Sequence, residues 1–368
     1  MKTSVCDEGR PHIFAQEFLW MEMAQRTFPW AEDDIGVLDD KYRLFMRTCE
    51  AVIKPLDLEY ARWKGNGRKP ADRLSICKAF ILKMTLNIPT TKDLVSRLQT
   101  ESLARRLCGW STPGAVPSES RFSVVFAEFA RLGFVAHWYE DFVAQNHGDI
   151  HVDTVSYDSA PIPVRARAVA TRREVAEWDP DQPEPPSRLP EQPGRSAQEN
   201  LSDLPQDCDW GCKLDSHGKK KNWKGGKLHV AVTSAGFPVA WAYTSASMHD
   251  SQAMIPLAQQ AAERVPHYFD LADAAYDSRI IRSVCEELGT IPLIDVNRRW
   301  NGDAAHNGMS LTEAKIYEQR TSAERFFSHV LDSHGGKTVR VKLPEKIVLH
   351  LGFGMLVVAV EQFVRMMC

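Results

Sequence analysis

Three acidic residues stand where regular elements could bring them together, namely Asp158, Asp273 and Glu324. Carboxylates that converge without positive partners repel one another and raise one another's pKa, so a folded chain keeps them together mainly to hold a cation. Oxygen-only ligands select hard cations such as Mg²⁺ or Mn²⁺ over zinc. Two such ions held roughly 4 Å apart activate an attacking water or 3′-hydroxyl and stabilise the leaving oxygen of a phosphodiester. The three acids therefore predict phosphoryl transfer on a nucleic-acid backbone.

Glu324 belongs to a stretch, residues 316–331, that the sequence predicts to be one helix. Tyr317, Arg320 and Glu324 follow one stripe of this helix, three and four residues apart. A neighbouring stripe has the spacing of a buried face and consists of Ala323, Phe326, Phe327, Val330 and Leu331. The acid is therefore expected at the edge of the core, with the arginine projecting the same way. An ordinary amphipathic helix with a solvated Arg–Glu pair is the alternative.

The two aspartates are expected on strands of one mixed sheet that is flanked by helices. From about residue 149, β-forming and polar residues alternate around Asp158, and a short apolar run at 268–272 ends just before Asp273. Ligand sites of such sheets form where strand ends open into a crevice, so the two acids are placed to meet. Asp153 is the alternative first acid, but it points to the opposite face of its strand. The other predicted elements are a hairpin of 224–234 and 237–245, helices from 250 or 251 to 264 and from 277 or 278 to 289, a strand at 290–295 and a final helix at 344–367.

The chain up to about residue 146 is predicted to be helical, over 12–26, 39–53, 71–86, 91–107 and 118–146 with a break at Gly133. Such an array suits a dimerisation platform, a DNA-binding module or a plain scaffold, and a helix-turn-helix over 89–107 is one alternative. Residues 165–206 are rich in proline and lack periodicity. They predict a flexible insertion within the second domain.

Composition sets the outer limits on these expectations. The chain has 368 residues, 43% of them hydrophobic, which is enough for two domains with real cores. The first thirty residues are interrupted by acids and lack the pattern of a signal peptide, and the most apolar run, 347–360, is short for a membrane span. The eight cysteines are scattered, which favours reduced thiols and a cytoplasmic protein without a membrane partner.

The net charge of −3 argues mildly against a nucleic-acid binder, but its distribution argues the other way. Basic residues gather at 165–173, 213–227 and 320–346. Arg320, the lysines of 219–227, and Arg298 with Arg299 are candidate phosphate contacts. Three aromatic residues are candidates for stacking on bases, with core packing as the alternative for each: Trp223, Trp300 and Tyr317.

Taken together, several motifs resemble bacterial insertion-sequence transposases of the DDE class. The motifs are DSAPIPV around Asp158, KGGKLHVAVTSAGFPVAW in the hairpin, TSASMHDS ending at Ser251, LADAAYDS around Asp273 and YEQRTSAERFFS around Glu324. The helical part contributes GRKPADRLSICKAFILKM and VPSESRF, so the resemblance covers about residues 67–366. It leaves outside it the proline-rich insertion and residues 1–66, which we expect to be a helical extension. It implies a helical transposase domain at 67–147 for DNA binding or dimerisation and an RNase H-like catalytic domain at 148–368.

The resemblance also implies an activity. Such a protein cuts transposon ends and joins them to target DNA, using two Mg²⁺ ions for which Mn²⁺ can substitute. Asp158, Asp273 and Glu324 are then the metal ligands, and Tyr317 and Arg320 handle DNA near the cleaved strand. The expected partners are the terminal inverted repeats, the target DNA and a second copy of the chain, in the cytoplasm at the nucleoid.

One position departs from the family pattern, which has a lysine seven residues after the glutamate where this chain has Leu331. Lys337, Arg340 or Lys342 then takes over that phosphate contact, beside Lys224 and Lys227 of the hairpin, or the grip on DNA is weaker. A transposase-derived DNA-binding protein with lapsed catalysis is therefore the alternative function, and a general metal-dependent nuclease is a third.

Other patterns suggest different chemistry. Four residues are a candidate zinc site, although their spacing is unlike known sites: Cys208, Cys212, His217 and His229. His249 and Asp250 are a candidate catalytic pair, but Asp250 is more simply a helix cap. A glycine-rich phosphate loop is absent, so use of ATP is not indicated.

Overall fold

The computed structural model describes residues 38–61, 67, 69–147, 151–169, 187–214, 219–296 and 309–367. The predicted helix at 12–26 lies outside these residues, as do His217, Arg298, Arg299 and Trp300. The chain forms two compact units, which we describe separately. Unit 1 is Met1–Phe142, Asp332–Thr338 and Leu349–Cys368, and unit 2 is Val143–Leu331 and Val339–Val348. The domain boundaries predicted from the sequence, which assign all of 148–368 to one domain, stay a prediction.

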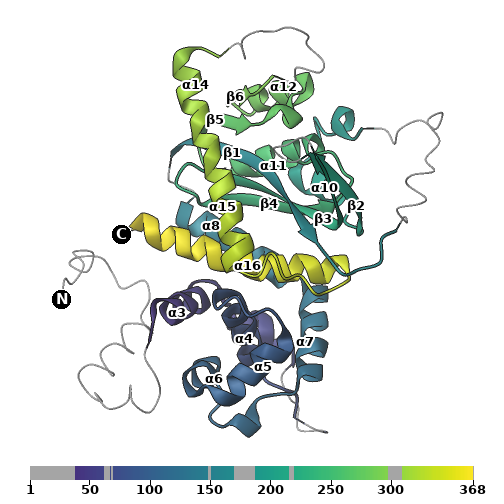
Figure 1. Ribbon diagram of the computed structural model, residues 1–368. Coiled ribbons are helices and arrows are strands. Elements are labelled where there is room, and N and C mark those ends of the chain that lie inside the picture. The colour runs from purple at the N-terminus through teal and green to yellow at the C-terminus, as the bar shows by residue number, and fades with distance from the viewer. Residues whose placement is uncertain are drawn as a thin grey trace. The chain divides into compact units, whose positions relative to one another are not determined.

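Unit 1 is helical, as the sequence predicts (Figure 1). Its helices are α3 (Asp40–Val52), α4 (Arg73–Thr85), α5 (Thr91–Thr100), α6 (Ser102–Cys108), α7 (Glu119–Leu132), the earlier part of α8 (Phe134–His147) and the later part of α16 (Pro344–Met367). Phe80 of α4 is the centre of an aromatic core, with its ring 4.8 Å from Phe126 and 5.8 Å from Phe353. Offset and edge-on ring pairs of this kind add to the free energy of area burial.

The predicted single helix at 91–107 is wrong, because the chain leaves helical geometry at Glu101. The Glu101 carboxylate accepts hydrogen bonds from the Tyr42 hydroxyl and, at 2.6 Å, from Arg97. Buried Arg105 donates to the carbonyls of Leu98 and Gln99, each at 3.2 Å, and so satisfies the end of α5. Two helices joined by one extended residue also lack the three- or four-residue turn of a helix-turn-helix.

Helix α16 (Pro344–Met367) is longer than the apolar run at 347–360. Among the described residues it is one helix whose length and composition would allow it to cross a membrane, but 78% of its apolar window is buried inside the protein. Burial of that extent is typical of a core helix.

Unit 2 is built on a six-stranded mixed sheet, which confirms the predicted fold class (Figure 1). Its strands are β1 (Val152–Pro163), β2 (Asp209–Leu214), β3 (Lys220–Thr233), β4 (Pro238–Ser245), β5 (His267–Ala272) and β6 (Ile291–Ile294). β1 runs antiparallel to β3 and parallel to β5, and β5 runs parallel to β6. β3 is long enough to pair with β2 along its first part and with β4 along its second. β2 is the one strand here that the sequence did not predict.

Alternate residues of β1 contact different helices. On one face the Thr154 hydroxyl lies 3.0 Å from the Gln319 side chain and the Ser156 hydroxyl 3.2 Å from Ser322. These partners belong to the segment of α14 (Leu311–Tyr317), a 3-10 turn (Glu318–Arg320) and α15 (Thr321–Ser333). The odd-numbered residues of β1 point to the other face, where the Tyr157 hydroxyl lies 2.7 Å from the Asp270 carboxylate of β5. Two further helices of unit 2 are α11 (Ser251–Arg264) and α12 (Arg279–Glu287).

The predicted continuous helix at 316–331 is interrupted. Glu318–Arg320 is a 3-10 turn between α14 and α15. The interruption lies where the segment is tied to the sheet, by Gln319 to β1 and by the Tyr317 hydroxyl, which donates to the Ala272 carbonyl of β5 at 3.2 Å. Tertiary hydrogen bonds thus override a local preference for α-helix.

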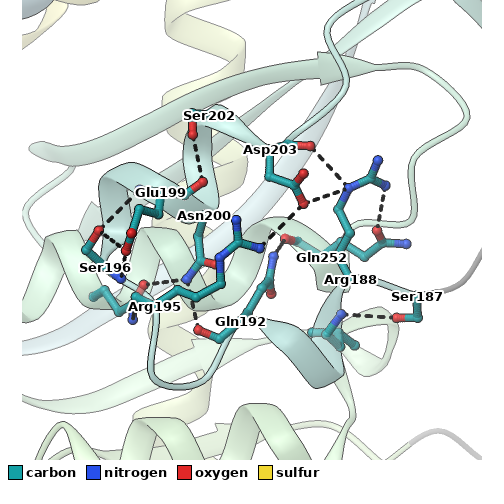
Figure 2. Close-up of polar contacts among 12 residues, drawn as sticks. Ser187, Arg188, Gln192, Arg195, Ser196, Glu199, Asn200, Ser202, Asp203 and Gln252 are labelled. Atoms are coloured by element: carbon teal, nitrogen blue, oxygen red, sulfur yellow. Dashed lines mark hydrogen bonds and ion pairs between the residues drawn. The ribbon is translucent and has the colours of Figure 1, made fainter.

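The prediction of a flexible insertion over 165–206 is wrong for its second half (Figure 2). Residues 187–206 contain a 3-10 turn and α10 (Ala197–Ser202), which begins with a capping box of Ser196 and Glu199. Buried Gln192 donates to the Gln252 carbonyl at 2.7 Å, and buried Asn200 donates to the Gln259 side chain at 3.1 Å. Hydrogen bonds from these side-chain amides to α11 hold the polar segment in a fixed conformation. A prediction based on the number of apolar residues does not detect such bonds.

Candidate active site

Asp158 lies in β1 on the face that contacts α15. Its Oδ1 accepts a hydrogen bond from the Ser159 N–H at 2.7 Å. Burial raises the pKa of its carboxyl to about 7, and the charges of Asp273 and Asp250 act in the same direction. Asp153, the alternative first acid, is exposed and five residues away, so it points to the other face of the strand.

Asp273 follows the last residue of β5. Its Oδ1 caps a short 3-10 turn by accepting from the Ala275 N–H at 2.9 Å. Burial raises the pKa of this carboxyl, and the neighbouring acids Asp250 and Asp295 raise it further. Because β1 and β5 are adjacent and parallel, the two aspartates meet at the same part of the sheet, as predicted.

Arg320 connects the two aspartates to Glu324. Its guanidinium donates to the Glu324 carboxylate at 2.8 Å and lies 4.0 Å from Asp158. Its positive charge lowers the pKa of both Asp158 and Asp273, against the effect of burial. Glu324 is half exposed, with 56% of its side chain accessible. The three acids thus lie around one guanidinium, although their carboxylate oxygens do not all come within 4.8 Å of one another.

Tyr317 is an anchor as well as a motif residue. Its hydroxyl donates to the carbonyl of Ala272, the residue before Asp273. Burial raises the pKa of Tyr317 to about 12, so the hydroxyl stays protonated near neutral pH. The tyrosine therefore fixes the segment that carries Arg320 against the strand that carries Asp273.

Asp250 and Asp295 are acids beside the site that were not among the predicted metal ligands. Asp250 stands at the N-cap of α11 but makes no capping bond, so its predicted role as a cap is wrong. Its carboxylate accepts instead from the Lys227 ammonium at 2.8 Å. Burial opposes ionisation, but the pKa of Asp250 is lowered overall, and the Lys227 ammonium is the cation that does this near neutral pH, because burial lowers the pKa of His229 to about 4 and leaves that ring neutral. Asp295 follows a strand end just as Asp273 does, and that signal was available in the sequence.

The basic residues that the sequence analysis named as phosphate contacts differ from one another in exposure and in their partners. Lys227 is largely buried and donates to Asp250 and, at 2.7 Å, to the Met248 carbonyl, so it is not among the exposed cations. Lys224 is partly exposed on β3, and Arg340 and Lys342 are exposed between α15 and α16. Lys337 belongs to unit 1 and pairs with Asp332. Leu331 is half-buried near the end of α15.

The alternative sites do not assemble among the described residues. Cys208 is buried beside the Ala166 carbonyl, and Cys212 is exposed. His229 is buried with one ring nitrogen 2.8 Å from the Thr244 hydroxyl. His249 contacts the Ser251 hydroxyl at 2.8 Å.

Comparison with known families agrees with this arrangement. A family model described as a transposase DDE domain matches residues 189–359, and a model described as a transposase domain (DUF772) matches residues 31–128. These two matches are typical of insertion-sequence transposases, and the transposase DDE domain is RNase H-like. The DDE match includes Asp273 and Glu324 and begins after Asp158. No curated protein and no solved structure matches the chain.

A divalent cation fits the chemistry of this donor set. DDE transposases generally use divalent metals. The three candidate ligands are carboxylates, which are the donors that hard divalent ions prefer. The raised pKa of Asp158 and Asp273 shows that the folded chain holds two acids in a place where an added positive charge would stabilise their ionised forms.

Proposed function

We propose that the protein is an active transposase that cleaves the ends of its element and joins them to target DNA. The observation that supports this most is the grouping of Asp158 and Asp273 with Arg320 and Glu324 in a chain of the DDE family. Nothing in the packing of the sheet requires acids at these places, since an aspartate buried to this degree opposes folding when ionised.

Asp158, Asp273 and Glu324 are the proposed ligands of two Mg²⁺ ions. Such ions lower the pKa of the attacking hydroxyl and stabilise the oxygen that leaves phosphorus. Arg320, which neutralises the acids in the free protein, is then available to bind a phosphate oxygen of the DNA. Tyr317 orients that arginine through its hydrogen bond to Ala272. The scissile bond lies between phosphorus and a 3′-oxygen, and the departing oxygen takes up a proton.

The wider assignment follows from the family. The proposed substrates are the terminal inverted repeats and target DNA, and two copies of the chain are expected because two ends must be paired. The proposed location is the cytoplasm, at the nucleoid. The proposed contacts to the DNA backbone are the exposed residues Arg340 and Lys342 and the partly exposed Lys224. Lys227 is not among them, because its ammonium group pairs with the Asp250 carboxylate.

The test is strand cleavage and joining with purified protein and linear DNA that carries the inverted repeats flanking its own gene. Wild type is compared with Glu324→Gln in Mg²⁺ or Mn²⁺. We expect metal-dependent products at the repeat ends that vanish in Glu324→Gln. Glu318→Gln, at an exposed acid six residues earlier in the chain, is the matched control and should retain activity.

Leu331 supports the second candidate, a DNA-binding protein whose chemistry has lapsed. Specific binding to the repeats without products in either metal would establish that function in place of the first. Cleavage of any duplex without preference for the repeats would instead indicate a general nuclease.

A further inference from the structure

Asp158 and Asp273 each have one carboxylate oxygen held by a backbone N–H. Oδ1 of Asp158 accepts from the Ser159 N–H at 2.7 Å, and Oδ1 of Asp273 accepts from the Ala275 N–H at 2.9 Å. Oδ2 of Asp158 is the oxygen that lies 4.0 Å from the Arg320 guanidinium. The direction of each carboxylate therefore depends on the position of the backbone beside it. Residues that fix this backbone act on the proposed metal ligands without belonging to them.

The Ser159 side chain points to the face of β1 opposite to that of Asp158, because neighbouring residues of a strand alternate between its two faces. On that reverse face the Ser159 hydroxyl forms side-chain hydrogen bonds with Asp250 and Tyr276. One serine thus holds Asp158 through its backbone and contacts two further residues through its side chain.

Tyr276 ends the short 3-10 turn that Asp273 caps. Its N–H donates to the Asp273 carbonyl at 3.0 Å, and the residue is 2% exposed. Burial raises the pKa of the Tyr276 hydroxyl well above its ordinary value, so this hydroxyl keeps its proton and can donate to Ser159. The serine hydroxyl can then donate to the Asp250 carboxylate, which only accepts. Ser159 is therefore a link between the strand of Asp158 and the turn of Asp273.

Asp250 holds the other end of this link. It stands at the N-cap position of α11 but makes no capping bond, although aspartate is among the preferred capping residues. Its carboxylate accepts from the Lys227 ammonium at 2.8 Å, and the same ammonium donates to the Met248 carbonyl at 2.7 Å. Replacing a buried ion pair by apolar side chains of similar volume is often neutral or stabilising, so folding alone does not account for this pair.

We propose that Ser159 is a positioning residue of the active site, which fixes Asp158 and Asp273 relative to each other from the reverse face of the sheet. Asp250, paired with Lys227, anchors its hydroxyl. Ser159 has this role only if the two aspartates hold a divalent metal, so the inference rests on the proposed function. Groups that orient metal ligands from outside are worth about 10–100-fold in metal affinity or activity.

A purely structural role predicts a different result. A hydroxyl that only stabilises the sheet lowers the melting temperature when it is removed, but leaves metal affinity unchanged in molecules that remain folded. Ser245 offers the matched comparison in the same unit. It ends β4, is 4% exposed, and its hydroxyl donates to the Asp207 carbonyl at 2.7 Å.

The experiment measures binding of Mn²⁺ to the full chain without DNA, from the electron paramagnetic resonance signal of the unbound ion. The binding counted is the part that Asp273→Asn abolishes, which assigns it to the proposed site. We expect Ser159→Ala to raise the dissociation constant for Mn²⁺ on the order of tenfold. Ser159→Thr retains a hydroxyl and should bind Mn²⁺ nearly as wild type does. Ser245→Ala should lower the melting temperature without weakening Mn²⁺ binding.

Tyr276→Phe tests the link itself. It removes the hydroxyl that donates to Ser159 and leaves the sequence of β1 unchanged, so it also carries the test if Ser159→Ala does not fold. We expect Tyr276→Phe to weaken Mn²⁺ binding several-fold. The double variant should bind little worse than Ser159→Ala alone, because both changes break the same link.

Equal Mn²⁺ affinity of wild type and Ser159→Ala would overturn the inference. Fully additive effects of Ser159→Ala and Tyr276→Phe, or a loss of affinity that Ser245→Ala shares, would also overturn it. A wild type without measurable Mn²⁺ binding would overturn it together with the proposed function. A wild type that binds Mn²⁺ but gives no products at the repeat ends would contradict the proposed function alone, so the two failures are distinguishable.

Discussion

Ser156 and Ser322 join the strand of Asp158 to the helix of Glu324, with their hydroxyl oxygens 3.2 Å apart. Each serine lies two residues before one of the candidate acids, and both are buried. A hydrogen bond at this point fixes the distance between β1 and the start of α15. It therefore acts on the geometry of the site without contacting a substrate.

Replacing either serine by alanine should lower the free energy of unfolding by on the order of 1 kcal/mol, because the remaining hydroxyl is left unpaired in the core. The double substitution should cost less than the sum of the two single ones. Urea denaturation of the four proteins measures this. Strict additivity would show that the two hydroxyls do not interact.

Removing the positive charge of Arg320 should change the pH dependence of activity. Arg320→Gln takes away the cation that lowers the pKa of Asp158 and Asp273, so both carboxyls hold their protons to higher pH. The acid limb of the pH–rate profile of DNA cleavage should then move to higher pH. Arg320→Lys retains the charge and should leave that limb nearer its wild-type position, although a lysine cannot reproduce the paired contacts of the guanidinium.

Asp158 should destabilise the metal-free protein above neutral pH. Its pKa of about 7 in the folded state lies above its ordinary value, so the folded chain binds this proton more tightly than the unfolded chain. The stabilisation by this bound proton is complete below about pH 4 and is lost as the pH rises to about 7. The free energy of unfolding falls by on the order of 4 kcal/mol over that range. Asp158→Asn should therefore raise the free energy of unfolding at pH 8 in a chelator and change it far less at pH 4.5. An equal effect at both pH values would contradict the raised pKa.

A buried carboxylate supports the sheet from its other face. Asp270, 1% exposed, accepts from the Tyr157 hydroxyl at 2.7 Å, from His267 at 2.9 Å and from the Thr290 hydroxyl. Asp270→Ala leaves these donors unpaired in the core and should cost about 3 kcal/mol or more of unfolding free energy. Tyr157→Phe removes one donor and should cost about 1 kcal/mol. Thermal and urea denaturation check the order, and the reverse order would show that Asp270 is not the centre of this network.

Leu331 offers a gain-of-function test. A lysine there restores the charge that the family pattern has at this position, on a half-buried site near the end of α15. Leu331→Lys should tighten DNA binding several-fold at low salt and increase the salt slope by about 1. Leu331→Met is the control for altered packing. Equal behaviour of the two variants would show that no phosphate passes near this residue.

The sequence alone determined the class of this protein and most of its elements. The alternation of β1, the apolar run before Asp273 and the stripe of Tyr317, Arg320 and Glu324 are local patterns that set which residues can share a face. They predicted the mixed sheet, and the motifs resemble those of DDE transposases, with which the two family-model matches agree.

Tertiary structure decided what each polar group does. Lys227 was predicted to contact DNA and Asp250 to cap a helix. The fold instead brings their side chains together as a largely buried ion pair. Gln192 and Asn200 fold a segment that composition marked as flexible, and Gln319 and Tyr317 interrupt a predicted helix. These interactions join residues far apart in the chain, so no local pattern encodes them. Their free energy depends on the distance and burial that only the folded chain sets.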